Sequence, residues 1–205
     1  MTHEKHLCIS CRALLPQTRF HKYKENPLSR IFWGRQKIET GTALYFFHKK
    51  GKVQRLIHQF KYKCNIELGH YLGTILGQNM AQSVHYSPVN CLIPVPLHPD
   101  KERKRGFNQS AVIAKGIAKS MKVEFRTDLL IRSKHTETQT RKDRLQRWQN
   151  VSSVFETPNP AILEQKSILL VDDVITTGAT LEACAEKLLQ VKGVRVWIAT
   201  LAITE

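Results

Sequence analysis

One segment of the chain, residues 167–180, constrains the fold more than any other. Ile168–Val171 is a run of apolar, β-favouring residues, which is typical of a strand buried on both faces. Asp172 and Asp173 lie at the C-terminal end of this run, and a turn of small residues, Thr176–Thr180, follows. The apolar residues beyond the turn recur at helical spacing: Leu181, Ala185, Leu188 and Leu189. The segment therefore predicts a strand–turn–helix unit of an α/β fold.

The composition of the turn fits a site for a phosphorylated sugar. A helix N-terminus offers unpaired N–H groups and the positive end of the helix dipole to a phosphate. Threonine hydroxyls add donors, and Gly178 lets the backbone approach a ligand closely. Asp172 and Asp173 would repel a phosphate, but carboxylates suit ribose hydroxyls or a Mg²⁺ ion carried by the ligand. The alternative is an ordinary strand-to-helix turn with a threonine N-cap.

Strands and helices alternate through the second half of the chain, which predicts parallel βαβ units. Strands are expected at residues 42–47, 90–96, 129–131 and 194–203, and helices at 53–60, 66–83 and 111–118. The polar, basic stretch at 97–106 is expected to be a surface loop. Residues 1–40 are polar and interrupted by proline, so they predict an irregular segment ahead of one domain at 41–205. Four aromatic side chains are expected to anchor that segment: Phe20, Tyr23, Phe32 and Trp33.

The charge of the chain is strongly basic, with 32 Lys and Arg residues against 17 Asp and Glu residues and a formal net charge of +15. A polyphosphate ligand, a nucleic acid and a merely solvated basic surface are all compatible with this charge. No stretch reaches the roughly 20 apolar residues that a membrane span needs. Residues 1–8 lack the apolar core of a signal peptide. We therefore expect a cytoplasmic protein without a membrane span.

Three polar segments each follow a predicted strand: 94–106, 132–150 and 172–180. Ligands of open α/β sheets bind beyond the carboxyl ends of strands, so these segments are expected to converge on one crevice. The first segment offers cations, the second is long enough to act as a lid, and the third is the phosphate loop. Together they predict a site for a highly anionic ligand that contains a sugar.

The sequence of residues 171–180, Val-Asp-Asp-Val-Ile-Thr-Thr-Gly-Ala-Thr, resembles the motif with which type I phosphoribosyltransferases bind 5-phosphoribosyl 1-pyrophosphate (PRPP). The resemblance implies that Asp172 and Asp173 contact the ribose hydroxyls and that Mg²⁺ accompanies PRPP. The residues that the resemblance assigns to the 5'-phosphate are Thr176, Thr177, Gly178, Ala179 and Thr180.

Four further segments are similar to ComF-type phosphoribosyltransferase-like proteins, a family associated with competence for DNA uptake: Leu56–Lys63, Ile93–His98, Arg103–Ser110 and Thr138–Lys142. This resemblance implies a type I phosphoribosyltransferase fold, in which helices flank a central, mostly parallel sheet. It places a hood at 41–89 and a PRPP-binding core at 90–205. The residues that it assigns to a pyrophosphate loop are Leu97, His98, Arg103, Lys104 and Arg105, and those on a flexible catalytic loop at 132–150 are Arg141 and Lys142.

Cys8-Ile-Ser-Cys11 is half of a zinc site, because a structural Zn²⁺ ion takes four ligands. ComF-type proteins carry two such pairs near the N-terminus, so the resemblance implies a partial zinc-ribbon-like segment here. His3 and His6 are candidates to complete the ligand set. An odd total of five cysteines argues against a disulfide framework. Two isolated cysteines are expected to be small buried residues: Cys91 and Cys184.

These patterns lead to two functions of different classes. The first is a phosphoribosyltransferase that binds PRPP and Mg²⁺ and transfers the phosphoribosyl group to an unknown acceptor, with release of pyrophosphate. The sequence shows no evident acceptor pocket. The alternative is a non-catalytic ComF-like protein that binds single-stranded DNA, or competence and replication-restart proteins, in natural transformation. A regulator that senses PRPP without turnover is a third interpretation.

Overall fold

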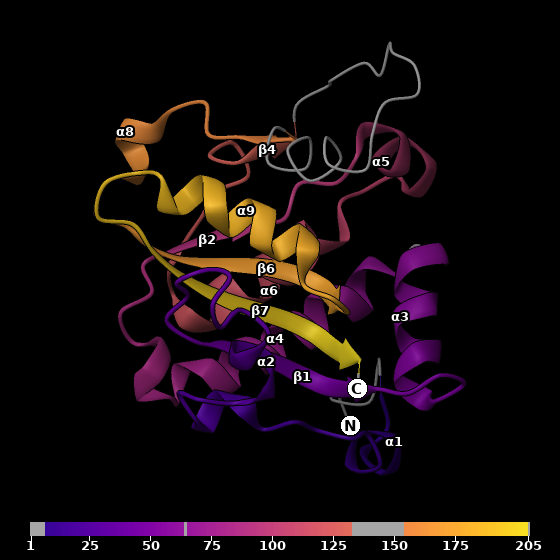
Figure 1. The fold of residues 1–205 in the computed structure, drawn as a ribbon. Helices are drawn as coiled ribbons and strands as arrows, with labels where there is room; N and C mark the ends of the chain where they lie inside the picture. Colours follow the sequence, from indigo (N-terminus) through magenta and orange to yellow (C-terminus); the bar gives the residue numbers. More distant parts are fainter. Residues whose placement is uncertain (1–6, 64, 133–153, 205) are drawn as a thin grey trace.

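A five-stranded parallel sheet forms the centre of the molecule (Figure 1). It is seen in a computed structural model that describes residues 7–63, 65–132 and 154–204. The strands lie in the order β1, β7, β6, β2, β3, and each neighbouring pair is parallel. Their bounds are Gly41–Phe47 for β1, Cys91–Pro94 for β2, Glu124–Phe125 for β3, Ser167–Ile175 for β6 and Arg195–Thr204 for β7. The predicted α/β fold with parallel strand pairing is confirmed.

Helices cover both faces of this sheet (Figure 1). The helices are α1 Ile9–Ala13, α2 Pro27–Arg30, α3 Lys52–Tyr62, α4 Ile66–Ala81, α5 Pro99–Arg105, α6 Gln109–Met121, α8 Pro160–Leu163 and α9 Ala179–Leu189. Two 3-10 turns, η1 Phe20–Lys22 and η2 Val84–Tyr86, and an antiparallel pair, β4 Ile131–Arg132 and β5 Phe155–Glu156, complete the described elements. Within the described ranges, no helix is long and apolar enough to cross a bilayer.

Strand β6 lies in the middle of the sheet and joins the two halves of the core. Leu169 and Val171 belong to the apolar cluster that includes α3, α4 and α6. Ile168 and Leu170 belong to the cluster on the opposite face, which includes α9. Alternate side chains of a strand point to opposite faces, so an unbroken apolar run is what a strand covered on both sides requires.

Helices α4 and α6 approach each other closely because glycines line their contact. A Cβ atom at Gly73 would lie 2.3 Å from the carbonyl oxygen of Ile113, and one at Gly116 would lie 2.4 Å from that of His70. Either distance excludes a real side chain, so only glycine permits this packing. The contact fixes α6, whose first turn brings Ser110 next to Asp172 of β6.

Most of the predicted elements are confirmed: β1, β2, β7, α3, α4 and α6 each overlap the expected range. The strand expected at 129–131 is confirmed only at its end, because Leu129 and Leu130 are core residues and β4 begins at Ile131. Strand β3 is short and was not predicted.

The surface loop expected at 97–106 is wrong over most of its length, because Pro99–Arg105 forms helix α5. His98 caps this helix, since its Nδ1 accepts a hydrogen bond from the backbone N–H of Asp100 at 3.2 Å. Proline opens the helix, acidic residues occupy its first turn, and basic residues occupy its last turn. This order of charges complements the helix dipole, and it stabilises a helix that has no buried residue.

The N-terminal segment packs against the core and contributes Leu15, Phe20, Leu28 and Phe32 as buried residues. Leu28 and Phe32 are fully buried, and the Asn26 side chain accepts hydrogen bonds from the first turn of α2 while donating one to the carbonyl of Gly41. The expectation that four aromatics anchor the segment is half right. Phe20 and Phe32 are buried, whereas Tyr23 and Trp33 are about 60% exposed. Trp33 instead lies at the surface, with the Arg30 guanidinium 5.4 Å from its ring centroid.

Candidate functional site

The acidic pair lies within strand β6 instead of after it. Asp172 is in register with Thr200 of β7, and pairing continues as far as Ile175. The strand is longer than its apolar run because β7 extends to Thr204 and supplies a partner for the additional residues. Asp172, Asp173 and the turn at 176–180 together form a site at the carboxyl edge of the sheet, and we call it the β6 site.

Asp172 is partly buried and is held by two hydrogen bonds. Its Oδ1 accepts from the Ser110 hydroxyl at 2.9 Å and from the backbone N–H of Asp173 at 2.8 Å. Burial and the neighbouring Asp173 charge raise the pKa of Asp172 to about 7, although these hydrogen bonds favour the ionised form. The pair is therefore a place where negative charge is concentrated and a cation is favoured.

Asp173 already holds a cation, the ammonium group of Lys61 at the end of α3. The Nζ–Oδ2 distance is 2.7 Å, and the two side chains are only 18% and 14% exposed. Sequence reasoning missed Lys61 as a site residue, because it lies 112 positions before its partner. The only signal was its place within the ComF-like stretch at 56–63.

The turn of the β6 site forms a small hollow at the N-terminus of α9. The hollow has a volume of about 50 Å³ and is lined by Asp172 and residues 174–181. Gly178 caps the helix in a left-handed conformation with φ +80°, so the threonine N-cap of the alternative interpretation is absent at this turn. Thr176, Thr177 and Thr180 are exposed at its rim. Backbone N–H groups and hydroxyls at a helix N-terminus are suited to a phosphate.

Arg35, from the N-terminal segment, contacts the turn that forms the hollow and stabilises it from outside. Its guanidinium donates to the carbonyl of Thr177 at 3.1 Å and pairs with the Glu182 carboxylate on α9. A Cβ atom at Gly178 would lie 3.0 Å from Ile31 and 3.3 Å from Phe32. The sequence did not predict this role of Arg35 either, because no local pattern indicates a contact between residues 142 positions apart.

The residues expected to face pyrophosphate lie on or next to α5, and the structure brings them only partly together. Leu97 and His98 are half-buried before the helix. Arg103 is 78% exposed and pairs with Asp100 on its own helix. Lys104 is also exposed. Arg105 donates to Gln109 at 2.8 Å, and its guanidinium lies 5.5 Å from the ring centroid of Tyr62, the residue after Lys61. Of this set, Arg105 therefore has the clearest link to the β6 site.

Several predicted site residues lie outside the described residues: Arg141, Lys142, His3 and His6. Cys8 and Cys11 are exposed, and the Cys8 thiol caps α1 by accepting a hydrogen bond from the backbone N–H of Cys11 at 3.3 Å. A side-chain hydrogen bond with Cys8, and then the charge of Cys8, raise the pKa of Cys11. Over the part of the chain that is described, no group of three or more His, Cys, Asp or Glu side chains is placed to hold a metal ion. Cys91 and Cys184 are buried, as expected.

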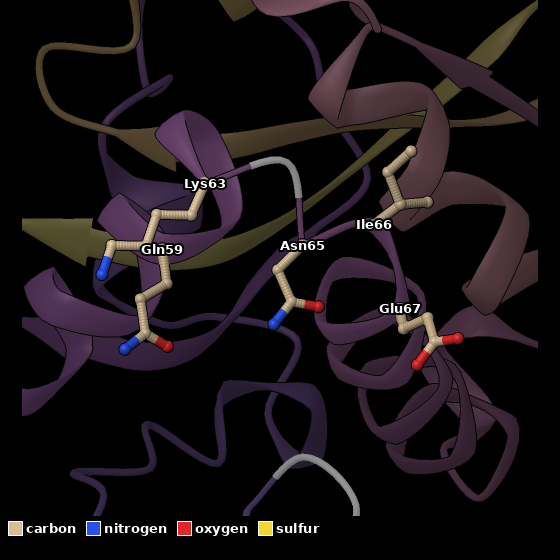
Figure 2. A pocket seen from close by; sticks show the side chains of 5 residues that line it. All are labelled: Gln59, Lys63, Asn65, Ile66 and Glu67. Carbon is tan, nitrogen blue, oxygen red and sulfur yellow. The ribbon is translucent and has the colours of Figure 1, made fainter.

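A larger cavity of about 410 Å³ lies between α3 and α4. Figure 2 shows Gln59 and Lys63 of the α3 end across from Ile66 and Glu67 of α4. Its lining combines one cation, one carboxylate and an exposed isoleucine. It shares no lining residue with the β6 site, which remains the candidate site.

Comparisons with known proteins bear on the same part of the chain. Residues 108–203 match the phosphoribosyl transferase domain family, and this range contains Ser110 and the whole β6 site. Competence protein F of Haemophilus influenzae is 31% identical over 150 residues, which cover 69% of this chain and 65% of that protein. DNA utilization protein YhgH of Escherichia coli K12 is 26% identical over 147 residues, which cover 69% of this chain and 64% of that protein.

A third relative, competence protein ComFC of Bacillus subtilis 168, is 35% identical over 99 residues, which cover 48% of this chain and 38% of that protein. The chain therefore spans less than two thirds of the length of each of these relatives.

Proposed function

Because this chain is a ComF-type phosphoribosyltransferase-like protein with a type I phosphoribosyltransferase fold, we propose that it binds PRPP with Mg²⁺ and transfers the phosphoribosyl group to an acceptor, releasing pyrophosphate. One observation carries the proposal: Asp172, Asp173 and the hollow at 176–180 lie side by side at the carboxyl edge of the sheet. Carboxylates can accept hydrogen bonds from ribose hydroxyls, and the hollow at the start of α9 suits the 5'-phosphate.

The residues present fit a Mg²⁺ ion. Magnesium takes oxygen ligands and is commonly held by one or two carboxylates together with substrate phosphates. Asp172 and Asp173 supply carboxylate oxygens next to the hollow, and the ammonium group of Lys61 on Asp173 supports the view that this position attracts positive charge. When bound, Mg²⁺ would offset the negative charge that develops on the pyrophosphate.

The protein's own residues would act by positioning and by charge. Departure of pyrophosphate from ribose C1 leaves positive charge on the sugar and negative charge on the leaving oxygens. The acidic pair would stabilise the former and orient the ribose. The basic residues proposed to stabilise the leaving group are Arg103, Lys104 and Arg105 of α5 together with Arg141 and Lys142, and the latter two would also help to exclude water.

Calorimetry with PRPP and Mg²⁺ tests the donor half of this function. The wild-type chain is expected to bind, and Asp172→Ala or Asp173→Ala is expected to weaken binding by at least about tenfold, because each removes a charged hydrogen-bond acceptor. Asp128→Ala is the matched control, since this exposed carboxylate pairs with Arg126 away from the β6 site. No binding by folded wild-type protein would overturn the proposal.

The acceptor half is tested by pyrophosphate release across a panel of amines and nucleobases. Release with one acceptor class identifies the substrate. PRPP binding without release for any acceptor would favour a protein that senses PRPP.

A second function, binding of single-stranded DNA, is favoured by the names of the relatives and by a particular basic cluster. Lys115 and Lys119 are exposed on one face of α6, next to His70 of α4. Burial, and then the charges of Lys119 and Lys115, lower the pKa of His70, so the two ammonium groups act on the same part of this surface. Binding that weakens steeply with salt, and that is lost in Lys115→Gln/Lys119→Gln, would support this function. Salt-insensitive or absent binding would argue against it.

A further inference from the structure

Lys61 is the cation that pairs with the acidic residues of the β6 site. It reaches Asp173 from the last turn of α3, with its ammonium 2.7 Å from Oδ2. The helix is firmly placed, because Phe60 is fully buried and contacts α4 where Gly69 leaves room for its ring. The long Lys61 side chain, which follows the buried Phe60, is thus held against the Asp173 side chain, which is 14% exposed.

We propose that Lys61 sets the cation specificity of the β6 site. Its ammonium group excludes a divalent cation that binds without a phosphorylated ligand. The ammonium leaves Asp173 only when such a ligand binds together with the cation and supplies new anions for the ammonium to pair with. This inference rests on the proposed function, since it concerns how the same site accepts Mg²⁺ and PRPP.

The physical reason is charge balance in a poorly hydrated place. A divalent cation on Asp173 would lie next to the ammonium group of Lys61, and the two cations would repel each other. Moving the ammonium away without a new partner leaves a partly buried charge unpaired, which is costly. PRPP carries phosphate groups, so in its complex the displaced ammonium can pair with the ligand. Every charge is then compensated, and the cation and the ligand are bound as a unit.

The experiment measures Mn²⁺ binding by electron paramagnetic resonance, with and without PRPP, in the full chain. Wild-type protein is expected to bind Mn²⁺ weakly without PRPP. Lys61→Met removes the competing cation, so its affinity for Mn²⁺ alone is expected to rise on the order of tenfold. The gain in Mn²⁺ affinity on adding PRPP is expected to be smaller in this variant than in the wild type, because the ligand loses its ammonium partner.

Lys63→Met is the matched control, because it removes the same charge two residues further on, at an exposed position. It is expected to change Mn²⁺ affinity less than twofold. Lys61→Arg keeps a cation and is expected to behave as the wild type. Lys61→Gln provides a second neutral variant, and circular dichroism confirms that each protein is folded.

Two failures can be told apart. If the wild type binds Mn²⁺ with PRPP but neither neutral Lys61 variant gains affinity for Mn²⁺ alone, the inference is overturned and the proposed function stands. The inference is also overturned if Lys63→Met gains as much as Lys61→Met. If neither wild type nor variants bind Mn²⁺ or PRPP, the proposed function itself fails, and the inference fails with it.

Discussion

At the residue scale, Asp172 is a carboxyl group that the fold holds partly buried beside a second carboxylate, that of Asp173. Its pKa is raised to about 7 by burial and by Asp173, against about 3.9 for an unfolded chain. A carboxyl whose pKa is raised in the folded state contributes to stability in full below about pH 4, where it is protonated in both states. This contribution is lost as the pH rises to about 7. Ionised Asp172 therefore destabilises the fold at neutral pH, and a cation bound next to it would offset this cost.

Asp172→Asn is expected to remove this instability. Asparagine keeps the shape and can still accept the Ser110 hydrogen bond, but it carries no charge. The melting temperature of the ligand-free variant should exceed that of the wild type by about 2–4 °C at pH 8 and by less at pH 5. Differential scanning calorimetry at both values checks this. Asp128→Asn is the control, and its effect on the melting temperature should have the opposite sign. The Arg126 hydrogen bond lowers the pKa of Asp128 to about 2, so removing this charge should lower the melting temperature. An equal gain at both pH values would contradict the account.

The same scale shows what local sequence can reveal. Asp172, Asp173 and the glycine-containing turn follow one another along the chain, so their chemistry could be predicted directly. Lys61 and Arg35 reach this turn from distant segments, and their roles depend on how α3 and the N-terminal segment pack. No spacing rule encodes such packing.

At the scale of elements, strands and helices with a clear apolar period were predicted well, whereas α5 was not. It buries no residue and is formed by its cap, its proline and its order of charges. Prediction from the spacing of apolar residues cannot detect such a helix. The turn into α9 was predicted to be a phosphate loop, with an ordinary turn capped by threonine as the alternative; its cap is Gly178 in a left-handed conformation, so the alternative is wrong about the cap.

Two glycines with the same backbone conformation allow the cost of backbone strain to be distinguished from the cost of side-chain packing. Gly178 and Gly106 have φ of +80° and +79°. A Cβ atom at Gly106 would meet nothing within 4 Å, so Gly106→Ala is expected to cost only the left-handed strain, about 1–2 kcal/mol. Gly178→Ala adds contacts with Ile31 and Phe32 and is expected to cost more and to weaken PRPP binding. Urea denaturation measures the difference, and equal costs would show that the two side chains move aside freely.

At the scale of the whole molecule, the N-terminal segment is structurally continuous with the sheet. The backbone N–H of Glu39 donates to Val196, and the N–H of Ile198 donates to Thr40, so the segment leads into β1 through hydrogen bonds with β7. The segment also contacts the β6 site through Phe32 and Arg35. An irregular segment was predicted there, and its described part contains the short helices α1, η1 and α2. Its share of the core follows from tertiary packing that the sequence pattern does not show.

This continuity predicts that substitutions in the segment act on the whole fold. Leu28 is fully buried, and Gly41 leaves room for it, since a Cβ atom there would lie 2.2 Å from the leucine Cδ2. Leu28→Ala is expected to cost about 2–5 kcal/mol in unfolding free energy, and Phe32→Ala about 3–5 kcal/mol. Trp33→Ala, at a 58% exposed position, should stay within about 0.5 kcal/mol of the wild type.

PRPP binding then separates the two core positions. Phe32 lies under Gly178, so Phe32→Ala should lower PRPP affinity in the protein that remains folded, whereas Leu28→Ala should lower stability with little change in affinity. Denaturant unfolding and calorimetry on the same samples measure both quantities. A single cooperative transition in which Leu28→Ala destabilises the whole domain would show that the segment folds with the sheet. An early, separate transition would show instead that the segment is an appendage and that the β6 site can form without it.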